Sequence, residues 1–146
     1  MIWVGNNEGI GIYDGSSWTI YNKNNSGLTS NEITSIKFGT DNIVWIGAYT
    51  GLYKFNGTTW TRYNDYMNTI WVNDLEIDNG NIWAATNNGI VRLTNGIIEY
   101  FPDSIYNYPT NLVSSVEKDQ LNNIWFCHLN TSSARNGVSY YNGNIF

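Results

Sequence analysis

Apolar residues occur in short runs that return along the chain at nearly constant intervals. The clearest run is a tryptophan between two apolar residues, which occurs at Ile2–Val4, Val44–Ile46, Ile82–Ala84 and Ile124–Phe126. Successive tryptophans of these runs are 42, 38 and 42 residues apart. A period of this length indicates a repeat architecture, in which each repeat is one small supersecondary unit.

The segments around each tryptophan run follow one order. A second apolar run begins at a glycine, and Asp14-Gly15 or Asn56-Gly57 then precedes a third run. Asp-Gly and Asn-Gly favour the backbone of tight hairpin turns. A further apolar run precedes each later tryptophan run, at 33–38, 72–77 and 113–118. Each complete repeat is therefore predicted to contain four short strands, named A to D in chain order, with the tryptophan on strand B.

Strand B is apolar at consecutive positions, whereas a sheet with one wet face would alternate. Both of its faces are therefore expected to be covered by neighbouring sheets. Four-stranded sheets of about 40 residues with this property are the blades of a β-propeller. A β-sandwich would not repeat one four-part unit in register, and a β-helix would need a shorter period. The predicted fold is all-β, a single partial β-propeller over 1–146 with about three and a half four-stranded antiparallel blades, at approximately 1–28, 29–67, 68–108 and 109–146.

The predicted ring is unfinished. The first repeat lacks strand A and the last stops within strand D, whereas closed propellers have roughly four to eight blades. Open faces and unpaired edges invite association. Three explanations remain open: a fragment of a longer propeller, which we favour, a ring completed by self-association, and a free-standing arc, whose end blades would lack polar caps. We expect that the chain is not a stable monomer.

Composition narrows the choice of partners. The net charge is −5 and the sequence has no basic cluster, which argues against nucleic acid and against anionic membranes as partners. No apolar run approaches the ~18 residues of a membrane span, and the N-terminus does not resemble a signal peptide. The single cysteine, Cys127, rules out an internal disulfide and is expected to be a buried apolar residue.

One known family resembles the repeat. Ser30–Ile36, followed by Asp41–Gly47 and Gly51-Leu52, is similar to the two-component regulator propeller repeat, and Asp78–Trp83 resembles its turn and strand. The similarity covers essentially the whole chain in four copies. It implies a β-propeller sensor domain of a hybrid histidine kinase, located in the periplasm or outside the cell. Many members of the family are thought to respond to glycans, so the resemblance implies a carbohydrate or another small ligand.

The four strand B tryptophans are expected to pack between blades, because they recur at the same position of each repeat: Trp3, Trp45, Trp83 and Trp125. Propeller ligands usually sit at the end of the central channel, over the loops entering strand A and leaving strand B, so residues near these loops are the candidates for a ligand-facing surface. These are Trp71, Tyr66, Tyr49, His128 and the insertion after Trp125.

No catalytic site is predicted. The only histidine, His128, has no identifiable nucleophile or acid partner, and with Cys127 it supplies too few ligands for zinc. Asp41, Asp78 and Asp119 recur in the turn between strands A and B, where aspartate closes a turn through its own side chain. We therefore expect no enzyme activity, cofactor or metal. The predicted function is ligand recognition by a sensory propeller. The alternatives are a structural or protein-binding propeller completed by self-association and, with least support, a glycan-active enzyme.

Overall fold

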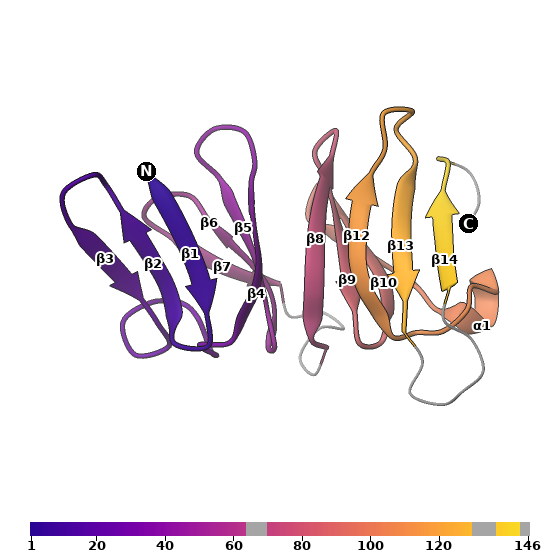
Figure 1. Cartoon of the computed structure of the whole chain (residues 1–146), viewed down its shortest axis with the longest axis horizontal. Coiled ribbons are helices and arrows are strands. Elements are labelled where there is room, and N and C mark those ends of the chain that lie inside the picture. Colours follow the sequence, from indigo (N-terminus) through magenta and orange to yellow (C-terminus); the bar gives the residue numbers. More distant parts are fainter. Residues whose placement is uncertain (64–69, 130–136, 144–146) are drawn as a thin grey trace. The chain divides into compact units, whose positions relative to one another are not determined.

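The structure is a computed structural model that describes residues 1–63, 70–129 and 137–143. These residues form fourteen β-strands, arranged in four antiparallel sheets, and one short helix, α1 (Asp103–Tyr106). Figure 1 labels the strands and colours them along the sequence, from indigo β1 to yellow β14. The predicted all-β propeller architecture is confirmed.

Within each sheet, strands adjacent in the chain are adjacent in space. The first sheet is β1-β2-β3 (Ile2–Asn6, Gly9–Tyr13, Trp18–Tyr21), and the second is β4-β5-β6-β7 (Ile33–Phe38, Val44–Ala48, Gly51–Phe55, Trp60–Tyr63). The third is β8-β9-β10-β11 (Val72–Asp78, Asn81–Thr86, Gly89–Thr94, Ile97–Phe101), and the fourth is β12-β13-β14 (Val113–Lys118, Ile124–His128, Gly137–Tyr141). Strands A of the repeat are β4, β8 and β12, and strands B are β1, β5, β9 and β13.

In the turns between strands C and D, the Asp and Asn side chains predicted to form the turns accept hydrogen bonds from the turn backbone. Asp14 Oδ1 accepts hydrogen bonds from the backbone N–H groups of Ser16 and Ser17, at 2.7 and 2.8 Å. Asn56 Oδ1 accepts the corresponding bonds from Thr58 and Thr59, at 3.1 and 2.8 Å. These bonds stabilise the hairpins between strands C and D and hold their registers.

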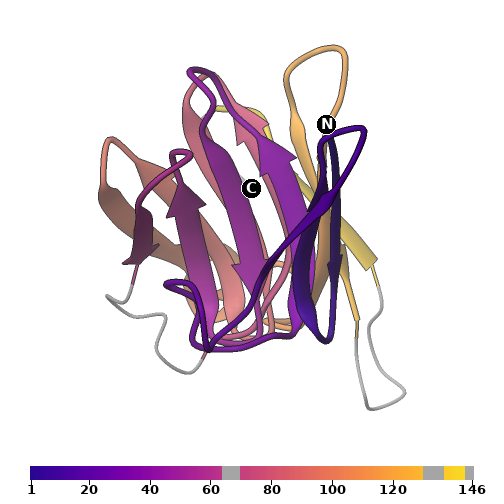
Figure 2. The same cartoon turned by 90° about the vertical axis from the view of Figure 1, so that its left-hand side faces the viewer.

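The chain divides into two compact units, Met1–Val72 and Asn73–Phe146, which are described separately. In the N-terminal unit, the first and second sheets share one apolar core. Figure 2 shows the indigo strands of the first sheet beside the purple strands of the second. The buried members of this core are Ile10, Ile12, Leu28, Ile33, Val44, Ile46, Ala48, Tyr53 and Phe55.

The C-terminal unit has a second core between the third and fourth sheets. It is centred on Trp83, whose ring lies 5.7 Å from the rings of both Phe101 and Phe126. Its other buried members are Ala85, Ile90, Tyr108, Val113, Val116 and Ile124.

The expectation that strand B is covered on both faces holds for only two of the four strands B. The apolar residues of β5 are buried except for the half-buried Trp45, and those of β9 are all buried. In β13 burial alternates, and in β1 every residue except the half-buried Trp3 is exposed. The expectation is therefore wrong for β1 and β13, because each belongs to a sheet with one face that no described sheet of its own unit covers.

Candidate functional site

Two of the predicted ligand-facing residues form a stacked aromatic pair in the N-terminal unit. The rings of Tyr49 and Trp71 lie 4.8 Å apart and are almost parallel, with 4° between their planes. Tyr49 is 38% exposed and Trp71 is 47% exposed. The pair therefore presents a flat aromatic surface to solvent at the end of the sheet where β5 turns into β6.

The turn that carries Tyr49 is firmly held. The Tyr49 N–H donates to the carbonyl of Glu32 at 3.2 Å. The carbonyl of the next residue, Thr50, accepts from the Arg62 guanidinium at 2.8 Å. The Thr50 hydroxyl lies 2.7 Å from the buried hydroxyl of Tyr53. These bonds limit the motion of Tyr49, so the cost of ordering it on binding is small.

Tyr66, the third predicted residue, and the segment 130–136 of the insertion after Trp125 lie outside the described residues. Their roles in a site stay predictions.

His128, the fourth predicted residue, has a buried side chain at the end of β13. Its Nδ1 lies 2.9 Å from the carbonyl oxygen of Thr110 and its Nε2 lies 2.7 Å from the Ser139 hydroxyl. Its ring lies 4.9 Å from that of Tyr108. Burial lowers the pKa of His128 and the Thr110 carbonyl opposes this effect only in part. Its geometry is that of a neutral packing histidine, and a role in ligand binding stays a prediction.

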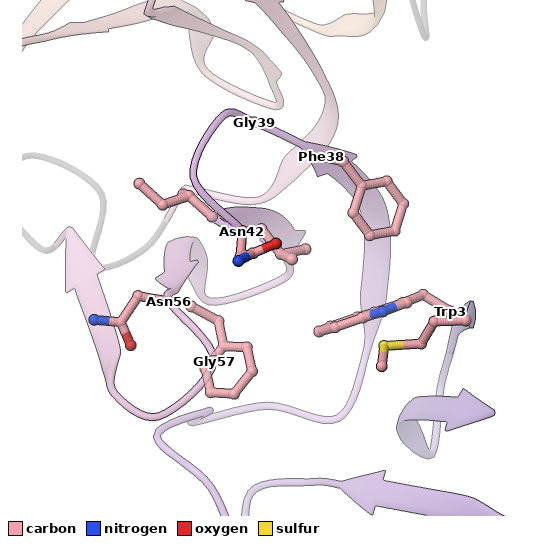
Figure 3. Close-up of a pocket in the computed structure, with 10 residues that line it drawn as sticks. Trp3, Phe38, Gly39, Asn42, Asn56 and Gly57 are labelled. Carbon is pink, nitrogen blue, oxygen red and sulfur yellow. The ribbon is translucent and has the colours of Figure 1, made fainter. Parts of the chain in front are cut away.

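A pocket that the sequence did not reveal lies between the first and second sheets. Its volume is about 520 Å³. Figure 3 shows the Trp3 indole pointing toward the middle of the pocket, with the Phe38 ring and the Asn42 amide beside it. The Trp3 and Phe38 rings meet edge to face at 5.8 Å, and the Trp3 and Phe55 rings are 6.2 Å apart. The remaining lining residues are Met1, Gly39, Ile43, Val44, Asn56 and Gly57.

The sequence predicts a packing role for Trp3, because a tryptophan recurs at this position in every repeat. It does pack on the N-terminal core, but one side of its indole also lines the pocket. The position of Trp3 in the repeat predicts the strand that carries it. It does not predict which side of the indole ring is left uncovered and lines the pocket.

Asp14 and Asp119, two of the acidic residues in the turns, each accept several hydrogen bonds from within their own turn or its flanking strand. Asp119 Oδ1 accepts from the N–H groups of Leu121 and Asn123, and its Oδ2 accepts from Trp125 Nε1 at 2.8 Å. Hydrogen bonds from the Trp125 and Asn123 side chains lower the pKa of Asp119 to about 2. Bonds from Ser17 and Ser16 likewise hold the pKa of Asp14 far below its usual range. Both groups are ionised at neutral pH and neither is poised as a general acid.

Among residues 1–63, 70–129 and 137–143, no group of three or more His, Cys, Asp or Glu side chains could hold a metal ion. Cys127 is exposed, not buried as expected. It lies on the open face of β13, because no described sheet of its unit covers that face. No helix among the described residues is long and apolar enough to cross a membrane.

Comparison with known proteins supports the fold. No protein-family model matches the chain, and no curated protein matches it. A solved structure assigned to a hybrid two-component system of B. thetaiotaomicron, the extracellular domain of BT3049, matches 99% of this chain with a TM-score of 0.80 and 19% identity. The match covers 20% of that domain.

Two further solved structures share the fold. Virginiamycin B lyase from Staphylococcus aureus matches 97% of this chain, with 18% identity and a TM-score of 0.65, over 50% of its own chain. PorZ, a surface component of the type-IX secretion system of Porphyromonas gingivalis, matches 80% with 14% identity and a TM-score of 0.63, over 20% of its chain. The chain thus spans between a fifth and a half of these solved chains. Its class is a segment of a β-propeller, and the match to the extracellular domain of a hybrid two-component system fits the family that the repeat resembles.

Proposed function

We propose that the chain is a non-catalytic ligand-recognition segment of a sensory propeller, which binds a carbohydrate at the Tyr49–Trp71 pair. The pair carries the proposal. Two parallel rings at 4.8 Å form a rigid, exposed platform with a phenol and an indole N–H at its edges. Aromatic platforms with polar handles suit ligands that combine an apolar face with hydroxyl groups.

The charge of the chain favours a neutral sugar over an anionic one. The net charge is −5, so the field of the protein repels anions. The hydroxyl groups of a pyranose can bond the ring edges, while its apolar face stacks on the exposed side of an aromatic ring. This matches the glycan response that the family resemblance implied.

The hydrogen bonding of the Asp14 and Asp119 carboxylates supports the non-catalytic part of the proposal. Asp14 and Asp119 are committed to their own turns, whereas glycoside hydrolysis needs two carboxyl groups with separated pKa values across a substrate. The proposed setting is the periplasm or the cell exterior, by likeness to the extracellular domain of BT3049.

A glycan-array screen followed by titration tests the proposal. We expect binding of at least one neutral sugar class, and a loss of about tenfold or more in affinity for Trp71→Ala, equivalent to about 1.4 kcal/mol. Trp18→Ala is the matched control, since Trp18 is also exposed and also contacts a tyrosine ring, Tyr13, at 5.2 Å. Absence of binding to any sugar class, or equal affinity of Trp71→Ala and wild type, would overturn the proposal. Conversion of the bound sugar would contradict its non-catalytic part.

Protein binding by self-association is a second candidate, favoured by the open face of the fourth sheet. Trp125 and Tyr140 stack on that face at 4.9 Å and are exposed together with Val138. In the first and third sheets the face bearing the strand B tryptophan packs on the next sheet. The proposed occupant is the first sheet of a second copy, where Ile2 and Val4 are exposed. Light scattering across a concentration series tests this candidate, and a single 16.6 kDa species throughout would exclude it.

A further inference from the structure

The two rings of the Tyr49–Trp71 pair are tied to one short stretch of the chain at the start of β4. The Tyr49 N–H donates at 3.2 Å to the carbonyl of Glu32, one residue before β4 begins. Thr34 Oγ1 donates at 2.6 Å to the carbonyl of Val72, which directly follows Trp71 in the chain. This stretch therefore holds both aromatic segments, one through its backbone and the other through a side chain.

A β-bulge aims the Thr34 side chain. The register between β4 and β5 shifts between Ile33 and Ser35, so Thr34 is the extra residue at this point of β4. A bulge bends its strand and redirects a side chain. The Thr34 hydroxyl consequently leaves its own sheet and meets Val72, the first residue of β8.

Gly47 on β5 leaves the space in which Val72 lies. A Cβ atom at Gly47 would be 2.7 Å from Val72 Cγ1 and 3.2 Å from Thr34 Oγ1. The backbone of Gly47 lies outside the left-handed region, so glycine is needed here for its lack of a side chain and not for its φ. Val72 is fully buried. A larger residue at position 47 would displace Val72, and the neighbouring Trp71 with it.

The third sheet forms the same link with a different pair of residues. Ala85 is the counterpart of Gly47, because each pairs with the second residue of strand C. Asn73, the second residue of β8 as Thr34 is of β4, donates through Nδ2 to the carbonyl of Val113 at 2.7 Å. The asparagine side chain reaches one bond farther than that of threonine, which compensates for the space that the Ala85 methyl group occupies. Glycine thus accompanies threonine, and alanine accompanies asparagine.

We propose that Thr34 and Gly47 are positioning residues for sugar recognition, which fix Trp71 in place against Tyr49. This positioning rests on the proposed function, because it concerns the same aromatic pair. Gly47 sets how closely Val72 approaches β5, and Thr34 holds that position through the Val72 carbonyl. The two rings are thereby kept at 4.8 Å with 4° between their planes. A site held by such supporting residues is ordered before its ligand arrives, so binding costs less conformational entropy.

Fluorine NMR of the full chain labelled with 5-fluorotryptophan measures the position of the Trp71 ring without any sugar. Trp71→Phe identifies the resonance. We expect Gly47→Ala to shift and broaden it, and Thr34→Val to shift it less. Thr34 is exposed and valine keeps its shape, so Thr34→Val is expected to fold.

Ser114→Ala is the matched control for the loss of a hydroxyl. Ser114 is the second residue of β12 and lies at the corresponding register shift. Its hydroxyl donates to the Cys127 carbonyl of its own sheet at 3.2 Å, and not to the next strand A. Ser114→Ala should therefore leave the Trp71 resonance unchanged.

Affinity for the neutral oligosaccharide with the strongest signal on the glycan array gives the second readout. Gly47→Ala should lower it about tenfold, corresponding to about 1.4 kcal/mol, and Thr34→Val about threefold. Thr34→Ser keeps the hydroxyl and should bind within about twofold of the wild type. The double variant Gly47→Ala/Thr34→Asn recreates the pair of the third sheet, so its affinity should return to within about threefold of the wild type. A general loss of stability would not be repaired in this way.

An unchanged Trp71 resonance in Gly47→Ala or in Thr34→Val would overturn the positioning role. A double variant that binds no better than Gly47→Ala would overturn it as well. If the wild type binds no neutral sugar, the proposed function is overturned, whereas the fluorine spectra still decide whether Thr34 and Gly47 position Trp71.

Discussion

Each unit pairs a three-stranded sheet with a four-stranded one, but the two units differ in how completely their cores are covered. In the C-terminal unit Trp83 is 1% exposed, with aromatic rings and the Arg92 guanidinium around it. In the N-terminal unit Trp3 occupies the equivalent place on strand B, but it is half-buried and borders a pocket. The same repeat thus forms a closed core in the C-terminal unit and an open core in the N-terminal unit. The two cores differ because the third sheet includes a strand A, whereas the first sheet does not.

A second difference lies on strand C. Trp83 pairs across strands with Arg92, whereas Trp3 pairs with Ile12. The Arg92 guanidinium lies 5.1, 5.4 and 5.6 Å from the rings of Trp83, Phe101 and Tyr141. Its Nε donates to Glu99 Oε2 at 2.7 Å. The C-terminal unit therefore adds a partly desolvated cation–π cluster where the N-terminal unit uses plain apolar packing.

The largest expected difference concerns the two tryptophans. Trp83→Ala should lower the free energy of unfolding by about 3–5 kcal/mol, because it opens a large cavity in a closed core. Trp3→Ala should cost less than about 2 kcal/mol, because the indole is already partly in contact with solvent. Urea denaturation followed by circular dichroism measures both. Equal losses would show that the two cores are equally closed and would break the comparison.

Val116 of β12 and Ile36 of β4 occupy equivalent positions on strands A, and they allow a second comparison of the free energy of unfolding. Val116→Ala should cost about 1.5–2 kcal/mol, since it removes two buried carbon atoms and leaves a cavity. Ile36→Ala removes three carbon atoms yet should cost only about 1 kcal/mol, because Ile36 is half-buried. The same denaturation experiment applies. A larger loss for Ile36 would mean that a strand already covers it in solution.

The cation–π cluster predicts a smaller effect. Arg92→Met keeps the aliphatic stem but removes the guanidinium from three rings, and it should lower the free energy of unfolding by about 1 kcal/mol. Lys54→Met is the control, since Lys54 lies 5.8 Å from the single ring of Trp45 on a less buried surface. The difference between the losses of unfolding free energy in the two variants measures the contribution of the cation–π cluster. Equal losses would show that the cluster adds no stability.

The smallest expected effect is a pH dependence that belongs to one unit only. Burial holds the pKa of His128 below its ordinary value of 6.5, so the folded state binds a proton less readily than the unfolded state. Stability is therefore full above about pH 6.5 and falls as the pH drops through and below that value. The equivalent residue of the second sheet is Ala48, which does not titrate.

His128→Gln tests this contribution, because glutamine cannot take up the proton. The slope of unfolding free energy against pH between about 6.5 and 5 should decrease in the variant. Asp119 titrates at about pH 2 in the folded protein and acts below this window. An unchanged slope would mean that His128 is solvated and open to a ligand after all.

The repeat made the fold predictable from sequence. Strands 33–38 and 113–118 were placed by pattern alone and agree with β4 and β12. Asp14 and Asn56 predicted the hairpins because their side chains bond the turn locally. Such local chemistry can be read from neighbouring residues, since no distant contact decides it.

The candidate site was predictable only in part. Trp71 stands out in the sequence because it lies outside the repeat, and Tyr49 because it follows strand B, but the stacking of the two depends on contacts between segments that are far apart in the sequence. His128 was chosen by its place at a strand end, whereas its side chain points inward to Thr110 and Ser139. The repeat pattern predicts which strand a residue belongs to. Whether a face of that strand is buried depends on the neighbouring sheet, which the pattern does not describe.

Hydrogen–deuterium exchange of the β1 and β9 amides, resolved by residue, tests the central claim that the N-terminal core is open at the edge of β1. Both are strands B and carry the recurring tryptophan. Among the described strands, β9 pairs with a strand on each side, whereas β1 pairs only with β2. We predict slow exchange throughout β9 and an alternation in β1, with every second amide exchanging rapidly because it faces the open edge. Uniformly slow exchange along β1 in the free chain would contradict the claim.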